Sequence, residues 1–502
     1  MSNRPERLRI INELGRKQTM PAEKEHFEVF GSGVETVFLG LGPEPERLPE
    51  LFPEYRAPLY IECPDFEQQV ADFASRVPGS FWRIEPEMFT SDFAGQVRVV
   101  RYRPNLKAFP SFWGPLAGRL AATGSRARSA KRRVWLPYQT EDLLGKELSR
   151  AFQDGDIAVS VPDAEALERS PGTELPKMLE QEKPELLLSV NFKGLDPFGL
   201  GFNLLREAGV RVAVWMVDNP FNLLPWMKSP FWKEADLFVT DASFIPVLES
   251  QGAKSVHHLP LAASPETFRE GGQLPKHARD ISEHPIFVGR SEFPKKDAFY
   301  AGLSLPDDAM REAEAMLLRG ERPDWFWWRK RLGIHALWPD NAVRKPSLGA
   351  EESGRRWRSM CLRAVDNLTV FGDDGWKDEG LSDVRPVLDY YAHLPAVYRA
   401  APFTLNMTSP LLPAGLTQRH FDVWCAGGFL LTDETPGLDI FPHDLVRAIS
   451  FRTPNDISGL MDEFSANEGF RREMRAAWES LILLEHTYEN RVTTLLKKLE
   501  LD

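Results

Sequence analysis

The stretch 405–436 is the part of the chain whose residue types are best suited to binding a polar ligand. Asp422 is followed by Val-Trp-Cys-Ala-Gly-Gly and then by the apolar run 429–432. This order predicts a helix that carries a carboxylate early, ends at Gly427-Gly428 and leads into a buried strand. A carboxylate held there can accept two hydrogen bonds from the hydroxyls of a ribose. A solvated Asp422 on a helix that the glycines merely cap is an equally open interpretation.

The loop before this helix, 409–418, reads SPLLPAGLTQ. Backbone N–H groups at the start of a helix have no partner within the helix, and they attract anions. We therefore expect phosphate to meet the backbone of Gly415, Leu416, Thr417 and Gln418. Arg419 stands next to this loop and is equally compatible with a structural role.

Two further places combine the end of a predicted strand with residues that can bind or react. Gly40 and Gly42 follow the run TVFLG at 36–40, and glycines there would let backbone amides approach a phosphate or a sugar. A plain tight turn is the more ordinary interpretation. Asp218 follows the apolar run 211–217, a position where α/β enzymes place functional groups. A cap before Pro220 explains this aspartate equally well.

The elements that must position these residues alternate between strands and helices. Predicted strands lie at 36–40, 58–62, 97–102, 157–161, 186–190, 211–217 and 237–241, and a second series lies at 285–289, 368–372, 403–407 and 429–432. Most are continuously apolar, as parallel strands buried on both faces are. The run 97–102 (VRVVRY) contains two arginines, which predicts an edge strand. The alternation indicates the α/β class.

The second series of strands predicts two tandem Rossmann-like domains. We expect the first at 1–261, a polar linker at 262–284, the second at 285–475, and a C-terminal helix at 476–502 that returns to the first domain. The second domain contains a helical insertion at about 303–367, with Trp325-Phe326-Trp327-Trp328 inside it. These aromatic residues either stack on a sugar or, as is more usual in helices, pack in a core. A cleft between the domains is the expected ligand site, because ligands bind at the carboxyl ends of parallel strands.

The composition excludes several classes of protein. The 502 residues carry a net charge of −12, unlike the basic footprint of a general nucleic-acid coat protein. Cys63, Cys361 and Cys425 lie far apart, which excludes a disulfide scaffold and favours a reducing, cytoplasmic location. No apolar stretch of the sequence is long enough to span a membrane. Metal-binding motifs are missing as well, so we expect neither a metal nor a resident cofactor.

Five motifs, in order, resemble those of one protein family. The run FDVWCAGGFLLTD at 421–433 resembles the group 1 glycosyltransferases of the GT-B superfamily, and within them the CgeB branch of spore-maturation-type proteins. The other motifs are VWMVDNP at 214–220, VHHLPLAASPETF at 256–268, IFVGRSEFPKK at 286–296 and EHTYENRVTTLL at 485–496. The resemblance covers the chain from about residue 184 to the end.

This resemblance implies a GT-B fold and an enzyme that moves a sugar from a nucleotide-sugar donor to a protein or glycan acceptor. It implies metal independence and, as in most of the group, retention of configuration. The donor diphosphate is expected on Gly289-Arg290 and on Lys295 or Lys296, and the ribose on Asp422. Ala414 replaces the first acid of the family's paired motif, which leaves the donor sugar open. Asp218 and Arg290 are the catalytic candidates.

Other interpretations stay open. The missing acid also fits a non-catalytic sugar-nucleotide-binding or assembly protein on the same fold, because a fold does not guarantee an activity. A local basic run comprises Arg119, Arg126, Arg128 and Lys131-Arg132-Arg133. A solvated loop is the more ordinary interpretation of this run, and contact with an anionic acceptor, a nucleic acid or a membrane face is the alternative. DNA binding through it would depend steeply on salt.

Overall fold

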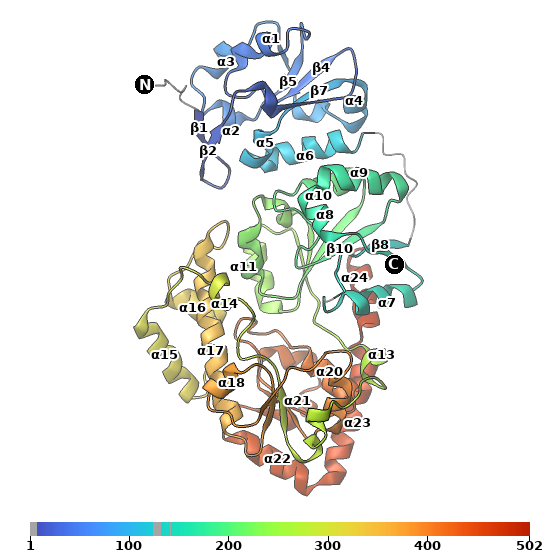
Figure 1. The fold of residues 1–502 in the computed structure, drawn as a ribbon, viewed down its shortest axis with the longest axis vertical. Helices are drawn as coiled ribbons and strands as arrows, with labels where there is room; N and C mark the ends of the chain where they lie inside the picture. The colour runs from blue at the N-terminus through green and yellow to red at the C-terminus, as the bar shows by residue number, and fades with distance from the viewer. Residues whose placement is uncertain (1–7, 124–131, 141, 502) are drawn as a thin grey trace.

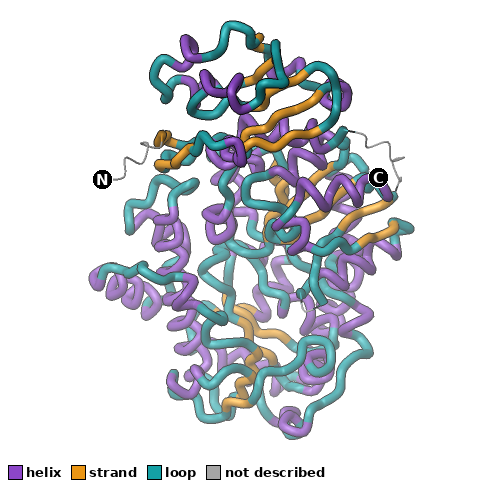
Figure 2. The backbone as a smooth tube through the Cα atoms, turned by 45° about the horizontal axis from the view of Figure 1, so that its top comes forward, coloured by secondary structure: helices purple, strands orange, loops and turns teal. Residues whose placement is uncertain are grey.

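The computed structural model describes residues 8–123, 132–140 and 142–501. It consists of sheets of mainly parallel strands with helices on their faces. Within these ranges the strands form a hairpin and three larger sheets. The three sheets follow one another along the longest axis of the molecule (Figure 1), and Figure 2 shows their strands in orange. The predicted α/β class with parallel sheets is confirmed. Arg126, Arg128 and Lys131 of the basic run lie outside the described residues.

The N-terminal sheet has the strand order β3-β7-β4-β5-β6. Its strands are β3 (Phe27–Phe30), β4 (Thr36–Leu39), β5 (Leu59–Ile61), β6 (Trp82–Arg83) and β7 (Arg98–Tyr102). The predicted edge position of 97–102 is wrong, since β7 lies between antiparallel β3 and parallel β4. Arg101 is accommodated there because Glu28 on β3 pairs with it at 2.6 Å. The hairpin β1 (Leu8–Ile11) and β2 (Lys17–Met20) precedes this sheet.

The middle sheet is fully parallel, with the order β13-β12-β11-β10-β8-β9. Its strands are β8 (Arg133–Trp135), β9 (Ala158–Ser160), β10 (Leu186–Val190), β11 (Arg211–Met216), β12 (Asp236–Val239) and β13 (Ser255–His258). The expected domain 1–261 therefore contains two separate sheets. They are joined where α6 (Pro110–Ala121) crosses α10 (Leu200–Glu207). A Cβ on Gly118 of α6 would lie only 3.0 Å from the backbone of Asn203, so a larger residue there would push the two helices apart by a few tenths of an ångström.

The C-terminal sheet is also fully parallel, with the order β16-β15-β14-β17-β18-β19. Its strands are β14 (Ile286–Val288), β15 (Thr369–Phe371), β16 (Val384–Arg385), β17 (Thr404–Asn406), β18 (Leu430–Asp433) and β19 (Ser450–Phe451). The expected linker at 262–284 contains the single-turn helix α13 (Pro265–Phe268), and its Phe268, Ala278 and Ile281 belong to the core of this sheet. It is a structured connection.

The helical insertion between β14 and β15 is confirmed. It consists mainly of α15 (Asp307–Leu318), α16 (Trp325–Arg331) and α17 (Arg344–Arg363). Trp325 and Trp328 are fully buried and belong to the core of the middle sheet. Trp325 stacks on Phe221 of α11 (Pro220–Leu223) with ring centroids 5.1 Å apart. Of the two interpretations of the tryptophan cluster, the structure therefore supports core packing, and the core in question is that of the neighbouring sheet.

The last helix returns to the middle sheet, as predicted. The helix α23 (Glu468–Glu485) packs on α20 (Arg419–Cys425), where Trp478 stacks on Trp424. The last helix, α24 (Tyr488–Lys498), lies beside α7 (Gly145–Asp154), and the two share a core with the middle sheet (Figure 1). Arg491 fixes this position through a bond from Nε to the carbonyl of Pro260 at 2.9 Å.

Candidate active site

The middle and C-terminal sheets each reverse their strand order at one point. In the middle sheet the reversal lies between β8 and β10, and in the C-terminal sheet it lies between β14 and β17. Loops that leave the carboxyl ends of such neighbouring strands separate and form a crevice, which is where open α/β sheets bind ligands. The candidate site therefore belongs at these strand ends, between the two sheets.

A cavity of about 380 Å³ lies there and receives residues from both sides. The middle sheet contributes its strand ends and the β8–α7 loop: Leu136, Pro137, Tyr138, Asp142, Leu143, Leu144, Gly145, Val190, Asn191, Lys193, Val217 and Asp218. The connection and the C-terminal sheet contribute Leu261, Tyr390 and Gln418. Its size suits part of a small polar ligand.

Asp218 is the catalytic candidate that the structure places in this cavity. Asn191 at the end of β10 donates from Nδ2 to Asp218 Oδ2 at 2.8 Å, and its Oδ1 accepts from the N–H of Val217 at 2.9 Å. The Asp218 side chain is exposed and lines the cavity, and desolvation of its carboxyl group by the surrounding protein atoms raises its pKa. Asn191 and Phe192 both have positive φ, 53° and 66°, which is strain of the kind often found at functional sites.

Lys193 brings a positive charge to the same cavity. It follows β10 and forms an ion pair with Asp142 of the β8–α7 loop. The sequence motifs described above do not predict a role for Asn191 or Lys193. A signal was present, because the polar Asn-Phe-Lys-Gly directly follows the buried run 186–190.

Asp422 lies behind the wall of the cavity. It is 1% exposed, and its carboxylate accepts from the hydroxyl of Tyr390 at 2.8 Å and from Nε2 of Gln418 at 3.0 Å. Burial raises the pKa of Asp422 well above its ordinary value, and the negative charge of Glu147 raises it further. Tyr390 and Gln418 line the cavity, and Asp422 holds both of them in place.

Gln418 also connects the two sheets. Its Nε2 donates to the carbonyl of Ala262 at 2.6 Å, and its Oε1 accepts from the hydroxyl of Tyr488 at 3.1 Å. The side chain therefore joins the connection after β13, the last helix and α20.

Arg290 and Lys295 are exposed cations that follow β14, and neither side chain forms an ion pair or a hydrogen bond within the described part of the chain. The neighbouring Ser291 is anchored, since Asp373 accepts from its N–H at 2.9 Å. Lys296, in contrast, is buried and paired with Glu292 and Glu352. Arg290 and Lys295 are thus available to an anion, and Lys296 is already neutralised.

The loop before α20 is largely occupied by contacts within the protein. Asp241 at the end of β12 accepts from the N–H of Ala414 at 3.0 Å, and Asn219 donates to the carbonyl of Leu411 at 2.7 Å. These bonds join the middle sheet to this loop. Gly415 packs close to Leu412 and Asp241, and Leu416 is buried in the core.

Thr417 and Arg419 converge on one side chain at the end of β17. The hydroxyl of Thr417 and Nε of Arg419 both donate to Oδ1 of Asn406, at 2.8 and 2.7 Å. Arg419 also donates to the carbonyl of Val288 at 2.6 Å, and Gly289 next to it lies against the same guanidinium. These residues fix the end of β14 relative to β17.

Gly40 and Gly42 belong to the N-terminal sheet and do not line the cavity. The corresponding turn of the middle sheet is the β8–α7 loop, whose Leu144 has a φ of 77° and whose Gly145 lies against Tyr138. A Cβ on Gly145 would lie 2.4 Å from the Tyr138 ring, so glycine is required there.

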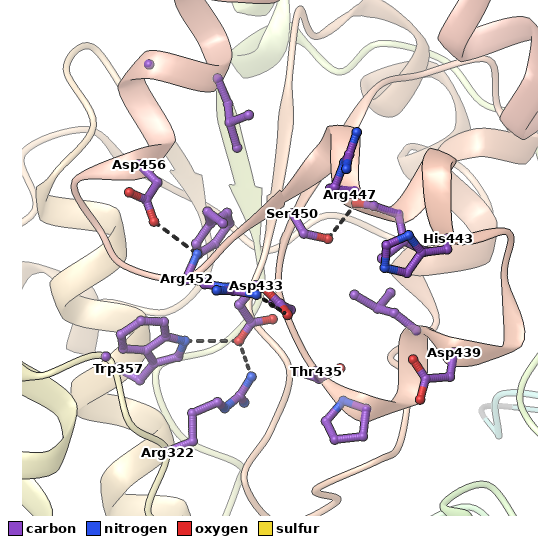
Figure 3. Close-up of a pocket in the computed structure, with 18 of the residues that line it drawn as sticks. Arg322, Trp357, Asp433, Thr435, Asp439, His443, Arg447, Ser450, Arg452 and Asp456 are labelled. Carbon is purple, nitrogen blue, oxygen red and sulfur yellow. Dashed lines mark hydrogen bonds and ion pairs between the residues drawn. The ribbon is translucent and has the colours of Figure 1, made fainter.

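A larger hollow, about 1040 Å³, lies at the ends of β18 and β19 (Figure 3). Arg322 and Trp357 converge on the buried Asp433, at 2.6 and 3.0 Å, and the N–H of Thr408 donates to the same carboxylate at 2.8 Å. Asp433 is therefore fully occupied in joining the insertion to the strand ends. The hollow lies at the far end of the C-terminal sheet from the reversal of strand order.

Among residues 8–123, 132–140 and 142–501, no group of three His, Cys, Asp or Glu side chains is placed to hold a metal ion. Within the same ranges, every helix is too short or too polar to cross a lipid bilayer.

Residues 355–497 match the model of a family described as glycosyl transferase-like. This match confirms the predicted resemblance at the level of glycosyltransferases for the C-terminal part, while the CgeB branch stays a prediction. A sequence search of curated proteins finds no match.

Solved structures with similar backbones include two of HepE of Anabaena and one of T4 phage BGT. HepE in complex with UDP-glucose is 8% identical with a TM-score of 0.42, and the alignment covers 73% of this chain and 99% of that one. HepE with UDP is 9% identical with a TM-score of 0.40, covering 74% and 99%. BGT in complex with UDP and Mn²⁺ is 10% identical with a TM-score of 0.37, covering 74% and 97%.

Proposed function

We propose that this chain is a glycosyltransferase of the CgeB type that transfers a sugar from a nucleotide-sugar donor to a hydroxyl group of a protein or glycan acceptor. The observation that carries the proposal is the cavity between the carboxyl ends of two parallel sheets, with Asp218 on one side and Tyr390 and Gln418 on the other. The glycosyl transferase-like match over 355–497 covers the side that would bind the donor.

The donor diphosphate is assigned to Arg290 and Lys295, because both are exposed and unpaired within the described residues. A guanidinium suits phosphate because it makes two parallel hydrogen bonds. The nucleoside is assigned to the wall formed by Tyr390 and Gln418. A direct bond from ribose to Asp422 requires that one of these two residues releases the carboxylate.

In the proposed reaction the acceptor oxygen forms a bond to C1 of the donor sugar, while the bond from C1 to the oxygen of the β-phosphate breaks. The electron pair leaves with the nucleoside diphosphate, whose growing charge Arg290 stabilises. Asp218 takes the proton of the acceptor hydroxyl. The raised pKa of Asp218 makes its carboxylate a stronger base than that of an ordinary aspartate. We expect retention of configuration, for which the acceptor oxygen approaches C1 on the same face that the phosphate leaves, and we expect no need for a metal.

The test is the release of nucleoside diphosphate from UDP-, GDP- and TDP-sugars by the full chain, with EDTA or with Mg²⁺. We expect slow hydrolysis of one donor, unchanged by EDTA and faster with a fitting acceptor. Asp218→Asn should lose at least tenfold in rate, while Asp439→Asn, an exposed carboxylate in the other hollow, should not. Equal rates for the two variants would remove Asp218 from the mechanism.

A second candidate is a non-catalytic protein that binds sugar nucleotides on the same fold. The buried state of Asp422 and the replacement of the other acid by Ala414 favour it, since both acids of the family's motif are then unavailable. Saturable binding of a sugar nucleotide without turnover, with candidate acceptors present, would establish this candidate.

A further inference from the structure

The N-terminal sheet has the topology of half a nucleotide-binding fold, and the proposed transferase does not use it. Numbered along the chain, the parallel strands β4, β5, β6 and β7 stand in the order 3-2-1-4. The order reverses between β4 and β7, and a ligand crevice is expected beyond the carboxyl ends there. The segments at these ends are Gly40-Leu41-Gly42, Glu62 and Asn105.

The glycine loop and Glu62 form one hydrogen-bonded unit. Gly40 and Gly42 have φ of +84° and +73°, which glycine adopts without strain. The N–H of Leu41 donates to Oε2 of Glu62 at 2.7 Å, and the N–H of Cys63 donates to Oε1 at 2.9 Å. In dinucleotide-binding folds an acid at the end of the second strand, about 20 residues after a glycine loop, hydrogen-bonds a ribose. Glu62 is 1% exposed, so a ribose reaches it only when the segments that cover it move.

The side chain of Asn105 is the feature that indicates a ligand at this end of the sheet. Its side chain is 2% exposed, and neither Oδ1 nor Nδ2 has a hydrogen-bond partner in the described chain. It lies against the glycine loop, because a Cβ on Gly40 would be 1.9 Å from its Nδ2. An unpaired buried amide costs about 1–3 kcal/mol. A carboxamide beside such a loop can pair with N6 and N7 of adenine.

The charges around the loop argue against a phosphate. Arg47 is paired with Glu44 at 2.5 Å, and Arg76 with Glu46 at 2.7 Å. The helix that follows, α1 (Leu48–Leu51), is a single turn. A ligand without phosphates fits these surroundings better than a nucleotide.

We propose that the N-terminal sheet binds an adenosine-type nucleoside, with the ribose hydroxyls on Glu62 and the adenine edge on Asn105. The hairpin β1–β2 spans this end of the sheet. Gln69, which follows β5, exchanges two hydrogen bonds with the backbone of Ile11 at 2.6 and 2.9 Å. Gln18 donates to the carbonyl of Pro104 at 3.4 Å. Entry of the nucleoside therefore requires movement of the hairpin.

The experiment is a calorimetric titration of the full chain with adenosine, with uridine and UDP as comparison ligands. We expect saturable binding of adenosine that uridine and UDP do not displace. Asn105→Leu should weaken it at least tenfold while Tm stays equal or rises, because the substitution removes an unpaired polar group. Asp218→Ala should bind adenosine normally, which separates this site from the transferase site.

The proposal fails if the full chain shows no saturable adenosine binding, if UDP competes for the same site, or if Asn105→Leu binds as the wild type does. Should Asn105→Leu fail to fold, Asn105→Ala carries the same binding test. Neither result bears on whether the chain releases nucleoside diphosphate from a sugar donor.

Discussion

Arg290 and Lys296 are near neighbours in the sequence, yet their surroundings are opposite. Arg290 is exposed and unpaired in the described chain, whereas Lys296 is buried between Glu292 and Glu352. A buried and paired lysine cannot turn toward a ligand without losing its ion pairs with both carboxylates. The positive charge available to a diphosphate in this segment therefore comes from Arg290 and Lys295.

Arg290→Ala should weaken the binding of the preferred nucleoside diphosphate by tenfold or more, about 1.4 kcal/mol. Titration calorimetry with UDP, GDP and TDP measures this. Arg311→Ala, which removes an exposed arginine from α15, is the matched control and should bind normally. Unchanged affinity in Arg290→Ala would show that the diphosphate binds elsewhere.

Asp422→Asn should lower the free energy of unfolding by about 1–3 kcal/mol, because one of its two donors, Tyr390 or Gln418, would lose its acceptor in a buried place. Chemical denaturation of the variant and of Asp439→Asn gives the comparison. Full stability together with weaker nucleotide binding would indicate instead that Asp422 contacts the ribose directly.

Glu62 should make the stability of the protein depend on pH. Burial raises its pKa from 4.5 to about 8, so the folded chain keeps a proton that the unfolded chain releases above pH 4.5. The contribution of this group is therefore full below pH 4.5 and is lost as the pH rises to about 8, by a few kcal/mol. Between pH 5 and 8, unfolding free energies should fall more steeply in the wild type than in Glu62→Gln. Parallel slopes would contradict the assignment.

At the scale of elements, α16 connects the two sheets that form the candidate site. It belongs by sequence to the C-terminal sheet and by packing to the core of the middle sheet. The stack of Trp325 on Phe221 and the bond from its indole N–H to Ser347 at 3.2 Å join these parts.

Trp325→Ala should destabilise the protein by about 3–5 kcal/mol, since it empties a large buried volume. Trp327→Ala removes the same side chain from a half-buried position and should cost less than half as much. Thermal unfolding of the two variants checks the difference. Similar losses of stability in the two variants would mean that the buried stack of Trp325 on Phe221 does not contribute more than an ordinary half-buried tryptophan.

The sequence predicts elements better than contacts between them. The strands at 186–190, 211–217 and 403–407 are found because a continuous apolar run needs no partner to be recognised. The short strand β8, which begins with Arg133, and β13, with its two histidines, lack that pattern and were not predicted. Because β8 is not recognisable in the sequence, the loop that ends at Gly145 is not recognisable as the turn after the first strand of its sheet. The sequence therefore points to Gly40 and Gly42 as that glycine turn.

The contacts that define the candidate site are distant in sequence. Tyr390 covers Asp422 from 32 residues away, and Glu352 neutralises Lys296 from 56 residues away. Such pairings follow from how the helices and loops pack, which motif spacing does not encode. The position of Asp218 at a strand end was predictable, because it depends on one strand alone.

At the scale of the whole molecule, the middle sheet is completed by the far end of the chain. Tyr488, Val492 and Leu495 of α24 share a core with Leu259 and with α7. The guanidinium of Arg491 bonds to the carbonyls of Pro260 and Leu261.

Removing residues 487–502 should therefore destabilise the middle sheet more than the C-terminal sheet, although the deleted helix follows the latter. Hydrogen exchange should speed up in β10 and β11 and change less in β17 and β18. Replacing the exposed Lys497 and Lys498 together by alanine keeps the helix in place and should leave exchange unchanged. Uniform acceleration in both sheets would show that the tail is not specific to the middle one.

The position of α24 also sets the order in which the molecule can be finished during translation. The strands of the middle sheet leave the ribosome long before Tyr488, Val492 and Leu495 are synthesised, so α7 and Leu259 keep an uncovered apolar face throughout that interval. The N-terminal sheet, whose core uses only residues up to Leu120, can close at once. During synthesis the N-terminal sheet is therefore complete while the middle sheet still has an uncovered apolar face. Packing of α24 covers this face.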